Sequence, residues 1–192
     1  MARSTTTLVP SPYAAAQAEG VDAAVFAKHA KMKILVVDDD PTNVALLEGL
    51  LGDNGYSRVA SVTDSRVAVE TCKSFQPDLI LLDLMMPGVD GFAVLEALRE
   101  HRSETFLPVL ILTVDVNEQT KLRALSAGAT DFLLKPFEQI EALLRIANLL
   151  EIRRLHLQME MQQLACEEAL RTCSSELRDT KGALAKKKWS DS

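Results

Sequence analysis

Residues 33–41 read KILVVDDDP, an apolar run followed by three aspartates and a proline. A segment that is apolar at almost every position is typical of a strand buried on both faces of a parallel sheet. Asp40 directly before Pro41 is typical of a helix N-cap with proline in the first turn, so we assign Asp40 a structural role. The stretch therefore predicts a buried strand that ends in carboxylates and leads at once into a helix.

The same pattern repeats further along the chain. The expected strands are 34–37, 58–62, 79–82, 109–112 and 132–134, and the expected helices between them are 42–51, 66–75, 92–99 and 118–127. Strands that alternate with helices predict an α/β fold, in which helices cover both faces of a doubly wound, five-stranded parallel sheet. Right-handed crossovers leave few topologies for such a sheet.

The amino-acid composition excludes several classes of protein. The 192 residues are 47% hydrophobic and 25% charged, which excludes a wholly disordered chain. The three cysteines form no C-x-x-C pair, which argues against a zinc ribbon or disulfide scaffold and favours a reducing compartment. We find no apolar run that could span a bilayer and no secretion signal, so we expect a cytoplasmic protein without a membrane partner.

We divide the chain into three parts. Residues 1–31 are expected to be a flexible leader, residues 32–148 the α/β domain, and residues 149–192 a helical extension with a basic tail. Segment 32–137 has a net charge of −7, which disfavours nucleic acid as a partner and suits a bound cation. The basic run 186–188 is interpreted as a solvated tail rather than a nucleic-acid contact.

Polar residues stand where the expected strands end. Asp38 and Asp39 follow the first strand, Asp83 the third, Thr113 the fourth and Lys135 the fifth. In an open parallel sheet, ligands bind beyond the carboxyl ends of the strands, so these side chains are expected to meet at one rim. The rim contains no His, Ser or Cys nucleophile.

This set of side chains suits phosphoryl chemistry. Clustered carboxylates repel one another unless a cation lies between them, and Mg²⁺ prefers oxygen ligands. One carboxylate left partly free can attack a phosphoryl group and form an acyl phosphate. Lys135 and the metal would neutralise the transferring oxygens, and Thr113 could hydrogen-bond one of them.

Four motifs resemble the receiver domain of bacterial two-component response regulators. They are KILVVDDDP at 33–41, PDLILLDLMMPGVDG at 77–91, ILT at 111–113 and GATDFLLKPF at 128–137, and the resemblance covers about residues 32–148. It implies five parallel strands in the order 2-1-3-4-5 with five helices. It also implies phosphorylation by a sensor histidine kinase or phosphotransfer protein, and no independent catalytic activity.

The resemblance assigns the acidic residues individually. Asp83 matches the phosphorylated aspartate. Asp38 and Asp39 match the acidic pair that holds Mg²⁺ together with Asp83 and the backbone carbonyl of Met85. We expect Asp39 and Asp83 to bind the metal directly, with Asp38 acting mainly through water. The alternative for Asp38 and Asp39 is helix capping and surface acidity.

The remaining matched residues concern the phosphoryl group and the switch. Thr113 and Lys135 match the switch hydroxyl and lysine, and the bond from Lys135 to Pro136 is expected to be cis. Phe132 matches the aromatic that swings inward, although its alternative is a plain core aromatic. Val114 is bulkier than the residue usual in the family at this position. It is therefore expected to narrow the access to Asp83 and to affect the rate of phosphorylation.

The C-terminal part predicts one long helix from residue 138 to about 180 that pairs two chains. Its first turns should pack on the sheet through Ile140, Leu143, Leu144 and Ala147. Beyond them, an apolar stripe with steps of four and three indicates a weak coiled coil and a homodimer. This stripe consists of Leu155, Met159, Gln162, Cys166, Ala169 and Cys173, and it competes with a second through Leu157, Met161 and Leu164.

Three functional interpretations remain. The first is a phosphorylation-switched module whose output is a partner or its own dimer. The second is the regulatory fragment of a longer regulator, because residues 148–158 resemble the linker before cyclic-di-GMP phosphodiesterase domains. The third, a haloacid-dehalogenase-like phosphatase, is disfavoured because residues 38–42 read DDDPT rather than D-x-D-x-T/V.

Overall fold

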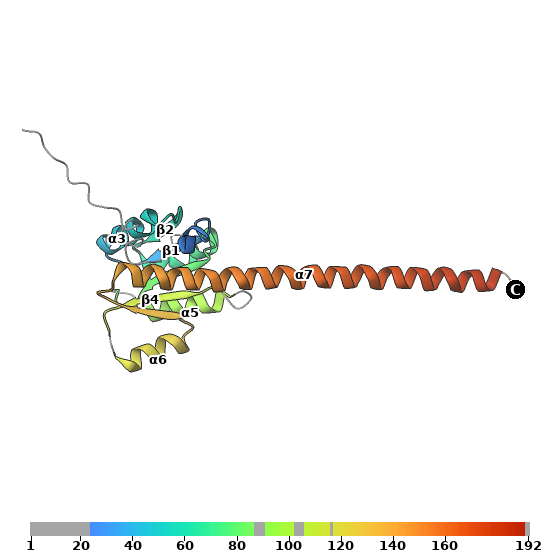
Figure 1. Ribbon diagram of the computed structural model, residues 1–192. Coiled ribbons are helices and arrows are strands. Elements are labelled where there is room, and N and C mark those ends of the chain that lie inside the picture. Colours follow the sequence, from blue (N-terminus) through green and yellow to red (C-terminus); the bar gives the residue numbers. More distant parts are fainter. Residues whose placement is uncertain (1–23, 87–90, 102–105, 116, 191–192) are drawn as a thin grey trace, which may run out of the picture. The chain divides into compact units, whose positions relative to one another are not determined.

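The computed structural model describes residues 24–86, 91–101, 106–115 and 117–190. Five parallel strands form one sheet in the order β2-β1-β3-β4-β5, as predicted (Figure 1). Their bounds are Lys33–Val37 for β1, Arg58–Val62 for β2, Leu79–Asp83 for β3, Val109–Thr113 for β4 and Asp131–Leu134 for β5. All neighbouring strands pair in parallel, so their carboxyl ends lie at the same edge of the sheet.

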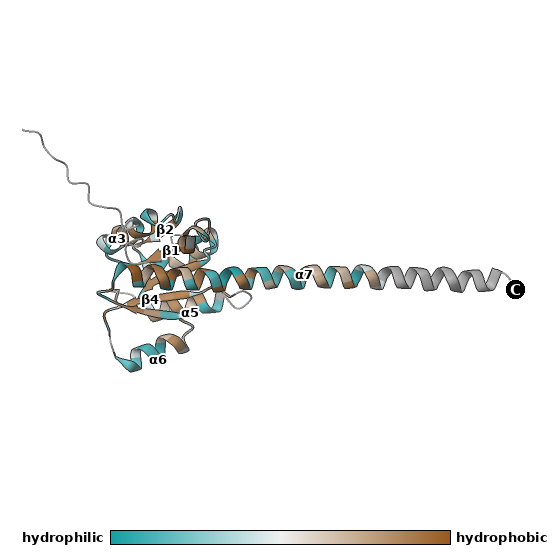
Figure 2. Ribbon diagram, in the orientation of Figure 1, coloured by the Kyte–Doolittle hydropathy of each residue, from teal (hydrophilic) through white to brown (hydrophobic). Residues whose placement is uncertain are grey.

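The three central strands form the apolar interior of the sheet. Every residue of β3 and β4 is buried, and so are the last four residues of β1, whereas most of β2 and β5 is only half-buried. The central strands are correspondingly hydrophobic in Figure 2. This difference follows from position, because helices cover both faces of the central strands and the outer strands each have one free edge.

Helices on both faces give two hydrophobic cores. The helices are α2 (Ala24–Ala27), α3 (Pro41–Asp53), α4 (Ala68–Phe75) after the short 3₁₀ turn η1 (Ser65–Val67), α5 (Gly91–His101), α6 (Glu118–Ser126) and α7 (Gln139–Ser190). Residues of α2, α3 and the first turns of α7 pack in one core, and residues of α4, α5 and α6 pack in the other. The doubly wound arrangement is therefore confirmed.

The helix after β1 begins as the sequence predicts. The side chain of Asp40 accepts a hydrogen bond from the backbone N–H of Thr42 at 2.8 Å, and Pro41 occupies the first turn. This hydrogen bond is the main cause that lowers the pKa of the Asp40 carboxyl. The structural role assigned to Asp40 as N-cap is confirmed, and the cap fixes where α3 starts relative to Asp38 and Asp39.

The described part of the predicted leader is packed against the domain. Phe26 on α2 is fully buried in the core that contains α3 and α7. His29 is also buried, and its Nε2 lies 2.9 Å from Oε2 of Glu151 on α7. Residues 24–31 therefore differ from the expected flexible segment, because one aromatic and one histidine attach them to the helix. Residues 1–23 lie outside the described residues.

Helix α7 confirms the predicted long helix and extends it to Ser190. Leu143 and Ala147 are buried as predicted, but Leu144 is 37% exposed. The buried face instead continues through Ile146 and Leu150, beyond the expected domain boundary at residue 148. The chain divides into two units after Arg153. No helix in the described ranges is both long and apolar enough to cross a membrane.

Candidate functional site

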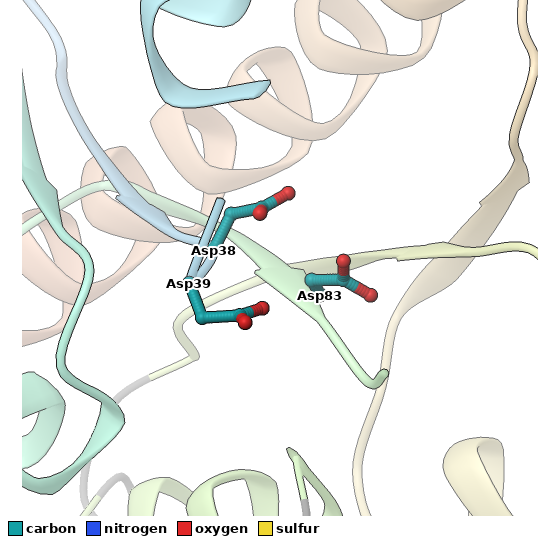
Figure 3. Close-up of side chains that lie close together, drawn as sticks. All are labelled: Asp38, Asp39 and Asp83. Carbon is teal, nitrogen blue, oxygen red and sulfur yellow. The ribbon is translucent and has the colours of Figure 1, made fainter. Parts of the chain in front are cut away.

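The predicted site residues meet at the carboxyl edge of the sheet. Asp38 and Asp39 follow β1, and Asp83 is the last residue of β3. One carboxylate oxygen from each of the three lies within 4.8 Å of the others. Figure 3 shows the three side chains gathered around one space. The parallel topology places them there, because residues that follow neighbouring strands share the same edge.

Asp38 is fully buried, and both of its carboxylate oxygens accept hydrogen bonds. Its Oδ2 accepts a hydrogen bond from Nζ of Lys135 at 2.8 Å. Its Oδ1 accepts from the backbone N–H of Asp40 at 3.0 Å and from Nδ2 of Asn43 at 3.2 Å. Three donors on two oxygens leave Asp38 little capacity for a further direct partner.

Lys135 joins the two buried carboxylates. Its ammonium donates to Oδ2 of Asp38 and to Oδ2 of Asp83, both at 2.8 Å. Burial opposes the charge of the ammonium, but the hydrogen bonds to both carboxylates outweigh this and raise the pKa of Lys135. The backbone N–H of Lys135 donates to the carbonyl of Thr113, which fixes the end of β5 beside β4. The bond between Lys135 and Pro136 is cis, as predicted.

Asp83 and Asp39 provide the open oxygens of the site. Oδ1 of Asp83 accepts one hydrogen bond, from the backbone N–H of Met85 at 2.9 Å, and its Oδ2 accepts one from Lys135. Asp39 is half-buried and makes no hydrogen bond or ion pair with any residue that the structure describes. Two carboxylates with unused lone pairs, side by side, fit a small hard cation with oxygen ligands.

The two predicted switch residues lie close by on β4 and β5. Thr113 is buried at the end of β4, and its Oγ1 accepts a hydrogen bond from the backbone N–H of Asp115 at 3.1 Å. Phe132 is half-buried beside the core formed with α5 and α6. The ammonium of Lys121 lies 4.7 Å from the centre of its ring. Phe132 is thus part of the core packing and also contacts a surface cation.

Val114 and Met85 both have exposed side chains. Val114 lines an apolar groove of about 410 Å³ between α3 and the segment from Lys135 to Gln139. Leu46 and Leu50 of α3 form part of its opposite wall. The effect of Val114 on access to Asp83 stays a prediction, as does the role of the Met85 carbonyl.

Sequence reasoning missed the contribution of Asn43, and it did not predict the hydrogen bond that Asp115 makes. Asn43 donates to the buried Asp38, and it stands three residues after the N-cap Asp40, where a helix side chain can reach back to the preceding loop. Asp115 accepts a hydrogen bond from Thr120, which is the main cause that lowers the pKa of the Asp115 carboxyl. Asp115 thereby joins the end of β4 to the start of α6, directly after the switch hydroxyl.

Comparison with known proteins agrees with this geometry. A family model described as the response regulator receiver domain matches residues 34–147. The response regulator PleD of Caulobacter vibrioides is 38% identical over 117 residues, which are 61% of this chain and 26% of PleD. The transcriptional regulator RpaA of Synechocystis is 41% identical over 118 residues, 62% of this chain and 48% of RpaA. The chain thus matches about a quarter to a half of the length of these relatives.

The solved structures give the same result for the fold. The chemotaxis protein CheY4 of Vibrio cholerae superposes with a TM-score of 0.58 at 30% identity, covering 62% of this chain and 98% of CheY4. The family match, from residue 34 to residue 147, includes the acidic edge. The chain therefore belongs to the response regulator receiver domain family.

Proposed function

We propose that Asp83 accepts a phosphoryl group from a sensor histidine kinase or phosphotransfer protein in a Mg²⁺-dependent reaction. The observation that carries this proposal is the position of Asp83 between the half-buried ammonium of Lys135 on one side and the open carboxylate of Asp39 on the other. Lys135 holds one oxygen of Asp83 at 2.8 Å, and Asp39 lies within the same acidic cluster. Such a site places positive charge beside the acceptor, which would offset the negative charge of an incoming phosphoryl group.

The reaction uses an unused lone pair on a carboxylate oxygen of Asp83. A carboxylate oxygen of Asp83 attacks phosphorus and forms the new oxygen–phosphorus bond. The phosphorus–nitrogen bond of a phosphohistidine donor breaks. The imidazole leaves with the bonding electron pair. Mg²⁺, when bound, would neutralise charge on the transferring oxygens. Asp39 and Asp83 would hold it directly, with the Met85 carbonyl, because the oxygens of Asp38 already accept three N–H donors.

Lys135 and Thr113 would complete the phosphoryl site. One N–H of the Lys135 ammonium can change its hydrogen-bond acceptor from Asp83 to a phosphoryl oxygen, while the hydrogen bond to Asp38 keeps the ammonium in place. Thr113 has a hydroxyl proton to donate, since its oxygen accepts from Asp115. Movement of Thr113 toward the phosphoryl group would open space for Phe132. We propose that Phe132 moves into this space and thereby transmits the effect of phosphorylation to the surface at α6.

Phosphorylation with a small-molecule donor tests the proposal. The full chain incubated with acetyl phosphate and Mg²⁺ should gain one phosphoryl group in its intact mass, and a chelator should prevent the gain. Asp83→Asn should abolish it. Asp115→Asn is the matched control, because it removes a nearby carboxylate that lies after a different strand, and it should retain the gain. A gain retained in Asp83→Asn would exclude Asp83 as the acceptor.

Metal binding tests the division of roles among the aspartates. Asp39→Asn should weaken Mg²⁺ binding markedly in calorimetric titration, because it removes a direct ligand. Asp40→Asn keeps the helix cap, because asparagine also caps helices, and removes no direct ligand, so it should reduce the affinity much less than Asp39→Asn does. Equal affinities for Asp39→Asn and the unaltered chain would contradict the assignment.

For the output we propose pairing of two chains through the part of α7 after Arg153. This helical segment exposes Leu155, Met159, Met161 and Leu164, which an isolated helix leaves in water. The alternative, a regulatory part of a longer regulator, is supported by the greater length of the relatives. Both proposals use the same switch at Asp83. The absence of nucleic-acid binding and the cytoplasmic location stay predictions.

A further inference from the structure

We propose that two copies of the chain pair in parallel and in register along one face of α7. We call this face the seam, and it consists of Leu155, Met159, Gln162, Cys166, Ala169 and Cys173. The inference rests on the proposed pairing and deepens it, because it fixes the face, the direction and the alignment of the two helices. It commits to a second copy of this chain as the occupant.

Exposure supports the seam as an unpartnered face. All six seam residues are exposed, and Met159 is 62% exposed. Figure 2 shows hydrophobic and hydrophilic bands alternating along this part of α7. The steps of four and three residues from Leu155 to Cys173 keep the six side chains on one stripe, as in a heptad repeat. A second helix with the same stripe would cover it.

Charge placement supports a copy of the same chain. The four charged residues between Leu155 and Cys173 are Glu160, Glu167, Glu168 and Arg171, and all lie at the three heptad positions farthest from the seam. The positions that flank the seam carry no Asp, Glu, Lys or Arg. They are His156, Gln158, Gln163, Ala165, Leu170 and Thr172. Two copies can therefore approach without charge repulsion.

The competing stripes are less suitable. The stripe through Leu157, Met161 and Leu164 continues into Glu168 and Arg171, which would place charges in the interface. A stripe through Gln163 and Leu170 omits Leu155 and brings Glu160 and Glu167 to its edge. The seam is the stripe that keeps all four charges on the outside.

Gln162 determines the direction and the register. It is the one amide in the seam, and a buried amide needs hydrogen-bond partners. In a parallel, in-register pair, Gln162 meets its own copy, and the two amides can donate to and accept from each other. The seam alternates between the two core positions of the heptad, and Gln162 occupies one kind while Met159 and Cys166 occupy the other. In an antiparallel pair, each kind of position faces the other kind on the second helix, so Gln162 would meet Met159 or Cys166. A single polar layer of this kind specifies register in coiled coils.

The two orientations differ most at Cys173. In the parallel pair, Cys173 faces Cys173 of the second copy, at a separation that a disulfide can bridge. In the antiparallel pair with Gln162 opposite Cys166, Cys173 lies opposite Leu155, and the two copies of Cys173 are about 27 Å apart along the helix. Cys166 lies near the centre of such a pair and discriminates less well.

Thiol crosslinking tests the inference. The variant Cys166→Ser leaves Cys173 as the exposed thiol among the described residues, since Cys72 is buried. Treatment with diamide, which takes up the two electrons and two protons of two thiols, should convert most of this variant to a covalent dimer. The control Cys166→Ser, Cys173→Ser, Arg171→Cys places the thiol on the outer face and should stay largely uncrosslinked.

Sedimentation of the same samples under reducing conditions separates the possible failures. Dimers with efficient crosslinking at Cys173 support the inference. Monomers at tens of micromolar, with and without acetyl phosphate and Mg²⁺, overturn the pairing itself. Dimers in which Cys173 crosslinks no better than the Arg171→Cys control overturn the parallel register. The intact-mass gain at Asp83 is measured separately, so its failure would count against the phosphoacceptor and not against the seam.

Discussion

The two parts of α7 have similar sequences and opposite environments. Leu143, Ile146 and Leu150 in its first turns are almost completely buried, whereas Met161 and Leu164 in the later turns are mostly exposed. Both parts contain several leucines and alanines and no proline. The difference shows that burial depends on what packs against the helix. The later turns leave apolar side chains in water, and for this reason we propose that this part of α7 pairs with a second copy.

The domain and the later part of α7 also differ in where they place charged residues. The domain buries Asp38 and Asp83 and places the ammonium of Lys135 between them, whereas the helix from Leu155 to Cys173 keeps its charged residues away from the seam. Buried charges are costly unless they are paired, and they persist where a function needs them. This contrast agrees with the two proposals, a charged ligand at the acidic edge of the domain and an uncharged face on the later helix.

Removal of Lys135 should have the largest effect on stability. Lys135→Met leaves Asp38 and Asp83 buried without a cation, so we expect the free energy of unfolding to fall by about 3–5 kcal/mol in urea denaturation. Mg²⁺ should restore part of the loss, because it supplies positive charge to the same carboxylates. An unchanged free energy of unfolding would show that these charges are not coupled as the geometry implies.

A matched pair of leucines tests the contrast within α7. Leu143→Ala should destabilise the domain by about 3 kcal/mol, because it creates a cavity in the core. Leu164→Ala makes the same change at a residue that is 67% exposed, and it should alter the unfolding of the domain by less than about 0.5 kcal/mol. Similar losses in urea denaturation for the two variants would remove the distinction between the two parts of α7.

A pair of glycines tests how closely the domain packs beside Asp83. A Cβ added at Gly91 would lie 2.6 Å from Cα of Leu84 and 2.8 Å from the carbonyl oxygen of Asp83. Gly91→Ala should therefore cost about 1–3 kcal/mol and slow phosphorylation. Gly49 in α3 has open space around it, so Gly49→Ala should stabilise the fold by about 0.5–1 kcal/mol. The reverse order of stabilities would refute the close approach at Gly91.

The smallest expected effect concerns the contact at Phe132. Lys121→Met removes the ammonium over the ring and should cost about 0.5–1 kcal/mol. In a Phe132→Leu background, the same substitution should cost almost nothing, because the aromatic face is already absent. Equal costs in both backgrounds would mean that the Lys121 ammonium does not interact with the ring.

Much of the site could be predicted from the sequence because parallel sheets obey a simple geometric rule. Asp38, Asp83 and Thr113 each end or follow a buried strand, and the strands place their carboxyl ends together. The role of Asn43 could not be predicted, because its hydrogen bond to Asp38 depends on how α3 packs beside β1. Local periodicity contains no information on that packing.

The boundaries of the domain were harder to predict for a similar reason. Phe26 is one aromatic in an alanine-rich segment, so it gives no periodic signal, yet it is fully buried. Leu144 and Ile146 both fit a helical pattern, and only the position of the sheet decides that Ile146 is buried and Leu144 exposed. Secondary structure follows from local pattern, whereas the phase of a helix follows from its tertiary contacts.

The most direct test of the account locates the phosphoryl group on the chain. Borohydride reduces an aspartyl phosphate to homoserine, so reduction after treatment with acetyl phosphate and Mg²⁺ marks the modified residue for peptide mass spectrometry. The account predicts homoserine at position 83, with Asp38, Asp39 and Asp115 unmodified. Homoserine at any of those three positions, or none anywhere after a confirmed mass gain, would contradict the assignment of Asp83 as the phosphoacceptor.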